Sequence, residues 1–399
     1  MTHGIHFGTL ALTLVILSVT AQAYLFFRIR RAVRSSRLSG RFKSCLIGLA
    51  GLAIVVLFVA NRYIMFEPIH WVDPPTAVQI LLFYPPVIWG FGSIFSALLL
   101  CIMWLAGRVC RLVYRLLAGW GGQKSSSAVN LGRRRLLQTG VCGLANLPLF
   151  LSGYGVACAG KDFEVGELTL PFGRVLRAVQ LSDIHSGIYM KSEDMRRIAD
   201  QVIRLQPDLL LLTGDYISNS MEFLPSCLEE MARIPARYGT FAVLGNHDHW
   251  RGEPIQIQKT FSQYGIPLLL NEHRVIQSEQ GSFAVVGIED LRSGNPDLEG
   301  ALRGLDPSLP KVLLSHRPEV FPAAAAHRIP ITLAGHYHGG QVKLSLPTGD
   351  ISLAHLVTPY PVGLFRIESS QMYVSPGLGT TFTPVRLNVP PEITLFHFS

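Results

Sequence analysis

Long apolar stretches dominate the first part of the chain. Four of them carry almost no charge: residues 6–27, residues 45–66, the later part of residues 75–107, and residues 136–158. Each is close to the roughly 20 residues that a helix needs to cross a bilayer. The fourth is the weakest because it contains Gln138, Asn146 and Pro148. The pattern predicts an all-α membrane region, residues 1–160, with about four transmembrane helices.

Beyond residue 175 the apolar runs become short and alternate with amphipathic segments. Residues 174–182, 208–213 and 240–244 have the composition of buried strands. Apolar positions recur at helical spacing from Ser192, a good N-cap residue, to Ile203. Strands alternate with helices at first and dominate later. This order predicts that the remainder of the chain is an α/β domain with two sheets stacked between helices.

Five of the strand-like runs end in residue types that bind metals. The side chains are Asp183 and His185, Asp215, Asn246 and His247, His316, and His336 with His338. In open α/β sheets, ligands gather at the carboxyl ends of the strands. A lone histidine such as His316 is more often structural, but five such ends in one chain together predict a metal site.

The types of residue also indicate the chemistry. Asp183 and His185 can hold one ion together because residues two apart in an extended segment point the same way, and His336 with His338 can do the same. The two oxygens of Asp215 can bridge two ions. Oxygen and imidazole donors without thiolates suit Mn, Fe, Zn or Mg. Two cations about 3.5 to 4 Å apart activate a shared water and hold a phosphoryl oxygen, so the donor set predicts phosphoester hydrolysis.

His247 and Asp248 are the candidates for proton transfer. The leaving alkoxide of a phosphoester needs a proton or a positive neighbour, and His247, next to Asn246, is well placed to supply one. Asp248 either orients His247 or is a simple turn residue. Arg386, further along the chain, either contacts a phosphate or forms a surface ion pair.

Charge separates the two parts of the chain. The net charge of +8 divides into +13 for residues 1–160, with 15 Lys and Arg against 2 Asp and Glu, and −5 for residues 161–399, with 20 against 25. The basic residues therefore belong to the membrane region, which argues against a nucleic-acid groove in the second part. The six cysteines lack paired spacing and indicate neither a disulfide framework nor a zinc finger.

The basic residues also predict an orientation. Short loops rich in Lys and Arg face the cytoplasm, which places residues 28–43 and 108–135 inside and the loop with Glu67 and Asp73 outside. Four crossings then leave residues 161–399 outside the cytoplasm. If the fourth apolar segment lies at the membrane interface instead, this part is cytoplasmic.

In chain order the motifs are D-x-H, G-D, G-N-H-D, an isolated His and G-H-x-H, over about residues 175–340. This set resembles the calcineurin-like metallophosphoesterase family. The segments SHRPEVF, AGHYHGGQ and PGLGTTFTPVRLNVPPEI further resemble its bacterial membrane-attached or exported phosphodiesterases. The resemblance implies one metal on Asp183, His185, Asp215 and His338, a second on Asp215, Asn246, His316 and His336, and His247 as the catalytic acid. Two small departures are Tyr337, where the subgroup often has Thr, and Glu289 in GIEDL.

On this resemblance, residues 161–399 form a four-layer α/β/β/α metallophosphoesterase sandwich. The expected protein is a multi-pass plasma-membrane phosphohydrolase with two divalent ions, of the phosphodiesterase or pyrophosphatase type. We expect its substrate to be an envelope or lipid-linked phosphoester, and we expect no nucleic-acid partner. The alternative is a catalytically silent metal-binding envelope sensor or scaffold, although every ligand position and His247 are filled.

Overall fold

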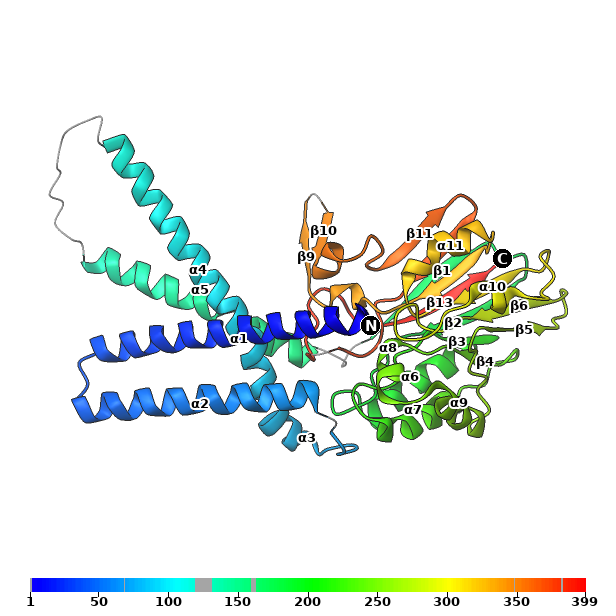
Figure 1. Cartoon of the computed structure of the whole chain (residues 1–399), viewed down its shortest axis with the longest axis horizontal. Helices are drawn as coiled ribbons and strands as arrows, with labels where there is room; N and C mark the ends of the chain where they lie inside the picture. Colours follow the sequence, from blue (N-terminus) through cyan, green and yellow to red (C-terminus); the bar gives the residue numbers. More distant parts are fainter. Residues whose placement is uncertain (1, 68, 119–130, 159–162, 348, 382) are drawn as a thin grey trace. The chain divides into compact units, whose positions relative to one another are not determined.

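The chain forms two compact units. The computed structural model describes residues 2–67, 69–118, 131–158, 163–347, 349–381 and 383–399 (Figure 1). The helical unit comprises Met1–Met65 and Ile80–Tyr154, and the α/β unit comprises Phe66–Gln79 and Gly155–Ser399. The loop between two of the long helices therefore belongs to the α/β unit, which the apolar pattern did not indicate.

Long apolar helices build the helical unit. They are α1 (Thr2–Ser35), α2 (Gly40–Phe66), α4 (Tyr84–Ala118) and α5 (Leu131–Cys158). The short α3 (Thr76–Val78) belongs to the α/β unit, and a π-helical turn, η1 (Gln79–Phe83), precedes α4. Among the described residues, the segments long and apolar enough to cross a membrane are Gly40–Met65, Thr76–Leu117 and Thr139–Ala157. The other predicted span, residues 6–27, is helical, but the side chains at its start lie outside the described part.

The packing of these helices leaves apolar surface uncovered. Ala21 and Leu25 of α1 pack against Ala97 and Leu100 of α4. On α2 the side chains of five apolar residues are 55–62% exposed: Leu49, Leu52, Val55, Val56 and Val59. Exposure of so long an apolar helix surface to water is unfavourable, whereas the acyl chains of a bilayer can cover it.

The first sheet of the α/β unit has five strands in the order β1-β13-β2-β3-β4. They are β1 (Glu164–Leu170), β2 (Leu176–Leu181), β3 (Leu209–Leu212), β4 (Thr240–Ala242) and β13 (Glu392–Phe398). β13 lies between β1 and β2, parallel to the first and antiparallel to the second. β2, β3 and β4 are parallel, so their carboxyl ends meet at one edge.

The second sheet has six strands in the order β11-β12-β8-β7-β6-β5. They are β5 (Glu272–Ile276), β6 (Phe283–Gly287), β7 (Lys311–Leu314), β8 (Ile331–Ala334), β11 (Gly363–Ile367) and β12 (Ser370–Val374). The central four are parallel, and β5 and β11 are antiparallel edges. The carboxyl ends of β7 and β8 therefore also meet at one edge.

The two sheets pack face to face over one apolar core. It includes Leu211 of β3, Val285 of β6, Leu333 of β8 and Phe396 of β13, all buried. Successive strand residues point to opposite faces, so Val286, next to Val285, instead packs in the outer cluster beneath a helix.

Helices cover the outer faces of both sheets. α6 (Ser192–Leu205) buries Met195, Ile198 and Val202 and contacts β13 and α7 (Leu224–Ala232). On the second sheet, α10 (Leu298–Leu302) contacts β5 and β6, and α11 (Phe321–Ala326) contacts β12. The predicted α/β/β/α layering, preceded by long apolar helices, is confirmed (Figure 1).

Shorter elements connect these layers. They are α8 (Asn246–Arg251), α9 (Pro254–Gln263), and the 3-10 turns η2 (Met221–Phe223), η3 (Pro318–Val320), η4 (His338–Gly340) and η5 (Leu353–Leu356). A two-stranded hairpin, β9 (Lys343–Leu346) and β10 (Gly349–Ser352), stands apart from the large sheets (Figure 1).

Candidate metal centre

The predicted metal-binding residues lie where strands of both sheets end. Asp183 and His185 follow β2, Asp215 follows β3, Asn246 begins α8 after β4, His316 follows β7, and His336 and His338 follow β8. Six of the seven side chains are at most 2% exposed, and His336 is partly exposed. The carboxyl edges of the two sheets thus bring residues from five separate loops into one buried site.

The backbone at the site is strained. Asp183, His185, Asp215, His336 and His338 have φ between 50° and 78°, and they make up five of the twelve described non-glycine residues with positive φ. The left-handed region is unfavourable for residues with a side chain, and such residues persist where surrounding structure enforces them, often at functional sites. The fold therefore accepts a conformational cost at most of the predicted ligand positions.

Asp183, His185 and His338 form a first group of donors. The Nε2 atoms of His185 and His338 lie 3.1 Å apart. Nε2 of His338 lies 3.3 Å from Oδ1 of Asp183. Asp215 adjoins this group, since its Oδ2 is 3.5 Å from Nε2 of His185.

A second group surrounds His316. Its Nε2 lies 3.2 Å from Oδ1 of Asn246 and 3.2 Å from Nδ1 of His336. The same Nε2 lies 3.3 Å from Oδ2 of Asp215. One oxygen of Asp215 is therefore shared between the two groups.

These spacings fit divalent cations. Two donors that are each about 2.1 Å from one ion, at an angle of roughly 90–109°, lie about 3.0–3.4 Å apart. The distances within the two groups and to Asp215 are 3.1–3.5 Å. Carboxylate, carboxamide and imidazole donors together suit the hard and borderline divalent ions.

The electrostatics also favour a cation. Burial lowers the pKa of His185 and that of His336 well below the ordinary value, so both are neutral donors. Burial opposes ionisation of Asp215, but the neighbouring His316 and His247 outweigh it and hold the pKa of the carboxyl well below its usual range. Burial likewise disfavours the His316 imidazolium, yet Asp215 raises its pKa to about 10. A buried anion at Asp215 thus requires positive charge beside it, from a proton or from a metal ion.

Comparison with known proteins agrees with this geometry. Residues 176–346 match the family model of the calcineurin-like phosphoesterases. The uncharacterized metallophosphoesterase YkuE of Bacillus subtilis is 30% identical over 223 residues, which cover 55% of this chain and 78% of that protein. The chain belongs to the calcineurin-like phosphoesterase family.

Two further relatives of this phosphoesterase show how the domain is used elsewhere. Phosphodiesterase YaeI of Escherichia coli is 30% identical over 277 residues, which cover 67% of this chain and 99% of that protein. A transmembrane protein with metallophosphoesterase domain from Danio rerio is 31% identical over 264 residues, covering 61% of this chain and 59% of that protein. Family membership supports hydrolysis of a phosphoester and divalent metal ions in the site.

His247 lies beside the two groups of donors in this phosphoesterase. Its ring packs edge-on against His185, with the centroids 4.7 Å apart. Nδ1 lies 2.7 Å from the carbonyl oxygen of Ser218, which can only accept, so Nδ1 carries a proton and Nε2 is the nitrogen that can gain or lose one. Nε2 lies 3.2 Å from Oγ1 of Thr381. We propose that His247 is the general acid rather than a metal ligand.

Asp248, expected to orient His247 or to be a turn residue, is buried and bonded to backbone groups. Its Oδ2 accepts hydrogen bonds from the backbone N–H groups of Asp215 and Gly245, each at 2.9 Å. Its Oδ1 accepts from the N–H of Tyr216 at 3.0 Å. We propose that Asp248 is a positioning residue that ties the loop of Asp215 to the loop of Asn246.

Arg317 belongs to the site, although nothing in the sequence pattern indicated this beyond its place next to His316. Its Nε donates to Oδ2 of the buried Asp290 at 2.9 Å. Its NH2 group donates to Oδ1 of Asn246 at 3.3 Å, and its NH1 group contacts Nε2 of His336. A buried guanidinium therefore lies against two residues of the second group.

Arg386 is not in a surface ion pair. The side chain is buried, and its guanidinium donates to the carbonyl oxygens of Pro376 and Gly377 at 2.9 and 3.0 Å. It also lies 3.3 Å from Nδ1 of His338. Burial lowers the pKa of Arg386 to about 10. The residue supports the loop behind the first group of donors.

The glycines that precede the predicted ligands allow close approach of the backbone. A Cβ on Gly245 would lie 2.1 Å from Oδ1 of Asp215 and 2.5 Å from its backbone nitrogen. Distances of this kind are impossible for real side chains, so the loops of Asp215 and Asn246 can meet only because residue 245 is glycine.

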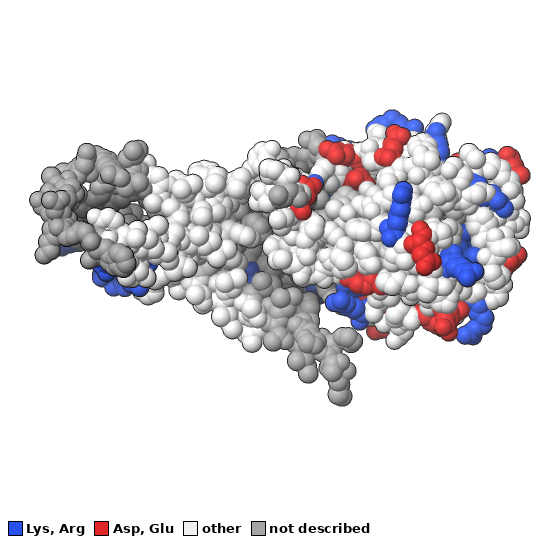
Figure 2. Space-filling view, turned by 90° about the horizontal axis from the view of Figure 1, so that it is seen from above, with Lys and Arg blue, Asp and Glu red and all other residues white. Residues whose placement is uncertain are grey.

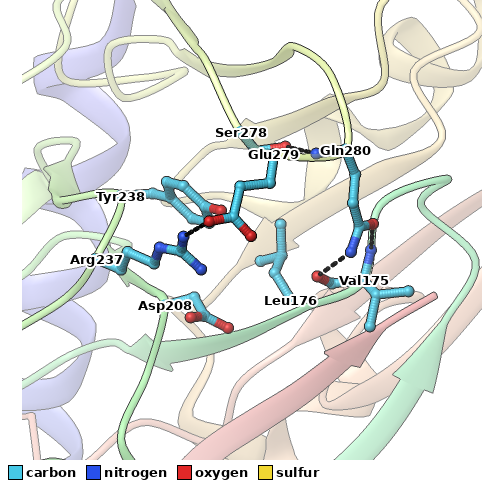
Figure 3. Close-up of a pocket in the computed structure, with 8 residues that line it drawn as sticks. All are labelled: Val175, Leu176, Asp208, Arg237, Tyr238, Ser278, Glu279 and Gln280. Atoms are coloured by element: carbon cyan, nitrogen blue, oxygen red, sulfur yellow. Dashed lines mark hydrogen bonds and ion pairs between the residues drawn. The ribbon is translucent and has the colours of Figure 1, made fainter.

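A hollow elsewhere on the surface belongs to a different edge of the fold. It is lined by Val175, Leu176, Asp208, Arg237, Tyr238, Ser278, Glu279 and Gln280 (Figure 3). Val175 and Asp208 immediately precede β2 and β3, whereas the metal centre lies after these strands. Arg237 and Glu279 form an ion pair across the hollow (Figure 3). It contains none of the predicted ligands.

Proposed function

We propose that this phosphoesterase is a membrane-anchored phosphodiesterase with two divalent ions, acting outside the cytoplasm on an envelope or lipid-linked phosphoester. The observation that carries the proposal is the position of Asp215 Oδ2, 3.5 Å from Nε2 of His185 and 3.3 Å from Nε2 of His316. A carboxylate shared by two groups of donors supports two ions rather than one. The first ion would be held by Asp183, His185, Asp215 and His338, and the second by Asp215, Asn246, His316 and His336.

The residues of the chain account for the remaining steps of hydrolysis. Bound divalent ions supply an activated water and positive charge beside the phosphoryl oxygens. The hydrogen bond from Nδ1 of His247 to Ser218 fixes the imidazole, so that Nε2 can deliver a proton to the leaving oxygen. The burial of the donor side chains lowers the local dielectric constant, which strengthens their interaction with a charged transition state.

The preference for diesters rests on the E. coli relative named as a phosphodiesterase. We expect the purified full-length chain, loaded with Mn²⁺ or Zn²⁺ in detergent, to hydrolyse bis(p-nitrophenyl) phosphate at least about 10-fold faster than p-nitrophenyl phosphate, a difference of about 1.4 kcal/mol in activation free energy. The measurement is kcat/KM for both esters. Faster monoester cleavage would contradict the phosphodiesterase assignment, and metal binding without turnover of either ester would favour the scaffold alternative.

The loop between α2 and α4 supports the proposed orientation. It contacts the segments that follow two predicted ligands: Asp73 Oδ1 accepts from the N–H of Ser192 at 3.0 Å, Lys191 Nζ donates to the carbonyl oxygen of Pro74 at 3.2 Å, and Asn219 Nδ2 donates to the carbonyl oxygen of Glu67 at 3.2 Å. A loop bonded to the α/β unit lies on the same side of the membrane as that unit. If α2 spans the membrane, the basic residues 28–43 lie on the opposite side, which the positive-inside rule assigns to the cytoplasm.

Labelling of cysteines in intact cells tests this orientation. In a variant with Cys45, Cys101, Cys110, Cys142 and Cys158 replaced by Ser, which leaves only the buried Cys227, we expect Ser308→Cys to react with a membrane-impermeant maleimide in spheroplasts. Ser308 is exposed on the α/β unit. The matched control, Ser39→Cys, is exposed in the basic loop and is expected to react only after permeabilisation. The reverse pattern would place the metal centre in the cytoplasm.

The surface of the α/β unit offers no support for a nuclease. Figure 2 shows acidic and basic side chains interspersed over the visible face of this unit, without a continuous basic strip. Residues 161–399 carry a net charge of −5, from 20 Lys and Arg and 25 Asp and Glu. Electrostatic attraction to a nucleic-acid backbone needs the opposite balance.

A further inference from the structure

The hairpin β9–β10 has one apolar face and one polar face. Leu344 pairs with Ile351, and Leu346 pairs with Gly349, so the side chains of Leu344, Leu346 and Ile351 share one face. These three side chains are 60%, 38% and 51% exposed. On the other face Lys343 and Asp350 form an ion pair at 2.7 Å. An isolated hairpin that exposes its apolar face to water is marginally stable, so the face is expected to have a partner.

The apolar surface continues beyond the hairpin. In η5 and the residue that follows it, Leu353, Leu356 and Val357 are 55%, 78% and 70% exposed. Of the 13 large apolar side chains that are exposed in the described residues of the α/β unit, six lie between residues 344 and 357. The exposed apolar surface of this unit is therefore concentrated in one segment, which we call the apolar hairpin (residues 343–357).

The base of the apolar hairpin is linked to the end of α5 through the segment 385–387. Val342 forms a β-bridge with Leu387, and the N–H of Lys343 donates to the carbonyl oxygen of Leu387 at 2.9 Å. Gly155, in the last turn of α5, lies so close to Val385 that a Cβ there would be 2.6 Å from its side chain. α5 contains the apolar segment Thr139–Ala157, which is long enough to cross a membrane. One short segment, residues 385–387, thus contacts both the base of the apolar hairpin and the end of α5. The proposed anchoring puts this helix end at the membrane surface.

The same segment is connected to the metal centre. His338 lies only five residues before Lys343, and between them Gln341 Oε1 accepts from the N–H of Thr381 at 2.6 Å. The hydroxyl of Thr381 lies 3.2 Å from Nε2 of His247. A surface held by the apolar hairpin would therefore lie close to the residues that act on the phosphoester.

We propose that the apolar hairpin inserts into the bilayer leaflet next to the end of α5, and that the substrate is a phosphodiester headgroup of a lipid in that leaflet. This inference rests on the proposed function and specifies the substrate class. The bilayer is the occupant that the attachment to α5 favours, because a hairpin tied to the end of a membrane-spanning helix meets lipid before it meets a soluble partner. Lipid insertion of Leu and Val side chains is favourable in proportion to the apolar area removed from water.

A fluorescence measurement tests the insertion without any turnover. The full-length chain carrying Leu356→Trp is reconstituted into vesicles of phosphatidylethanolamine and phosphatidylglycerol, with or without lipids brominated on the acyl chains. We expect the fluorescence added by this tryptophan to be quenched at least about two-fold by the brominated lipids. The matched control is Val175→Trp, at an apolar position that is 70% exposed and lies beside the hollow of Figure 3; its added fluorescence should not change. Absence of quenching at residue 356 would overturn the inference. It would mean that the segment faces water, a second copy of the chain or the helices of the same chain instead of lipid.

Turnover in the same vesicles tests the substrate class. We expect the triple variant Leu344→Ser, Ile351→Ser, Leu356→Ser to lose at least about 10-fold in hydrolysis of a fluorescent phosphodiester lipid and to keep its rate on bis(p-nitrophenyl) phosphate within about two-fold. The control Val175→Ser, Ile255→Ser, Val275→Ser should keep both rates. Equal rates of the two triple variants on the lipid would overturn the inference. Failure of the unsubstituted chain on both substrates would instead contradict the proposed function and leave the quenching result to decide the insertion.

Discussion

Asp215→Asn is expected to lower kcat/KM for bis(p-nitrophenyl) phosphate by at least about 10³-fold, which corresponds to about 4 kcal/mol in activation free energy. The carboxamide keeps the size of the side chain but removes the negative charge and replaces one carboxylate oxygen with an NH₂ group, which cannot bind a metal ion. Because Oδ2 of Asp215 lies 3.5 Å from His185 and 3.3 Å from His316, the substitution affects both ions. We therefore expect the metal content, measured by plasma mass spectrometry, to fall from two ions per chain to one or fewer.

His247→Gln is the matched variant in the same site. It is expected to lower turnover by about 10²–10³-fold, the usual contribution of a general acid, while both ions are retained. The comparison distinguishes a metal ligand from a general acid, because only the Asp215→Asn variant is expected to lose metal. Two bound ions and full activity in Asp215→Asn would contradict the shared position of the carboxylate. Loss of metal in His247→Gln would make His247 a ligand, consistent with its place in a third group of donors with His185 and Asp215.

Gly245→Ala is expected to disrupt the centre through packing rather than through charge. The added Cβ would lie 2.5 Å from the backbone nitrogen of Asp215, which cannot move without breaking its hydrogen bond to Asp248. Overpacking of this kind costs about 3 kcal/mol, which lowers the apparent Tm of a domain of this size by roughly 6–12 °C. Displacement of Asp215 should also lower turnover by about 10²-fold. Differential scanning fluorimetry and the diester assay measure the two effects.

Gly265→Ala is the control for a simple backbone effect. Gly265 has φ +70° and open space around its Cβ position. An alanine there would have no steric clash, so its only cost is the left-handed conformation, which lowers the free energy of unfolding by about 1 kcal/mol. Turnover should not change. If Gly245→Ala and Gly265→Ala lowered the apparent Tm equally and left turnover intact, the close approach of the two loops would not matter for the site.

The local pattern of the sequence predicted the strands that end at the site and the residues that follow them. Asp183, Asp215 and His316 each come within three residues of the end of a short run rich in apolar residues, and parallel strands of one sheet bring such ends together. Arg317 and Arg386 could not be assigned to the centre in this way. Their guanidinium groups bind residues such as Asp290 and Pro376 through contacts that depend on the final packing of loops.

Contacts between residues that are far apart in the chain also could not be predicted from the sequence pattern. Asp73 and Ser192 are 119 residues apart, and no periodicity connects a loop between apolar helices to a loop of the α/β unit. The strand β1 was not predicted, because its half-exposed edge carries Glu164, Gly166 and Glu167 among the apolar residues. The place of its partner β13 in the interior of the first sheet follows only from tertiary packing.

The interior position of β13 sets an order of events in biogenesis. Residues Glu392–Phe398 separate β1 from β2, so the first sheet cannot close until this last strand has left the ribosome. β1, the first strand of the unit, must therefore wait, during synthesis, for a partner about 230 residues later in the chain, whereas β2 and β3 pair with each other directly. If the α/β unit is exported, its polypeptide crosses the membrane either unfolded or only after β13 has been synthesised, and the first sheet is completed as a late step in both cases.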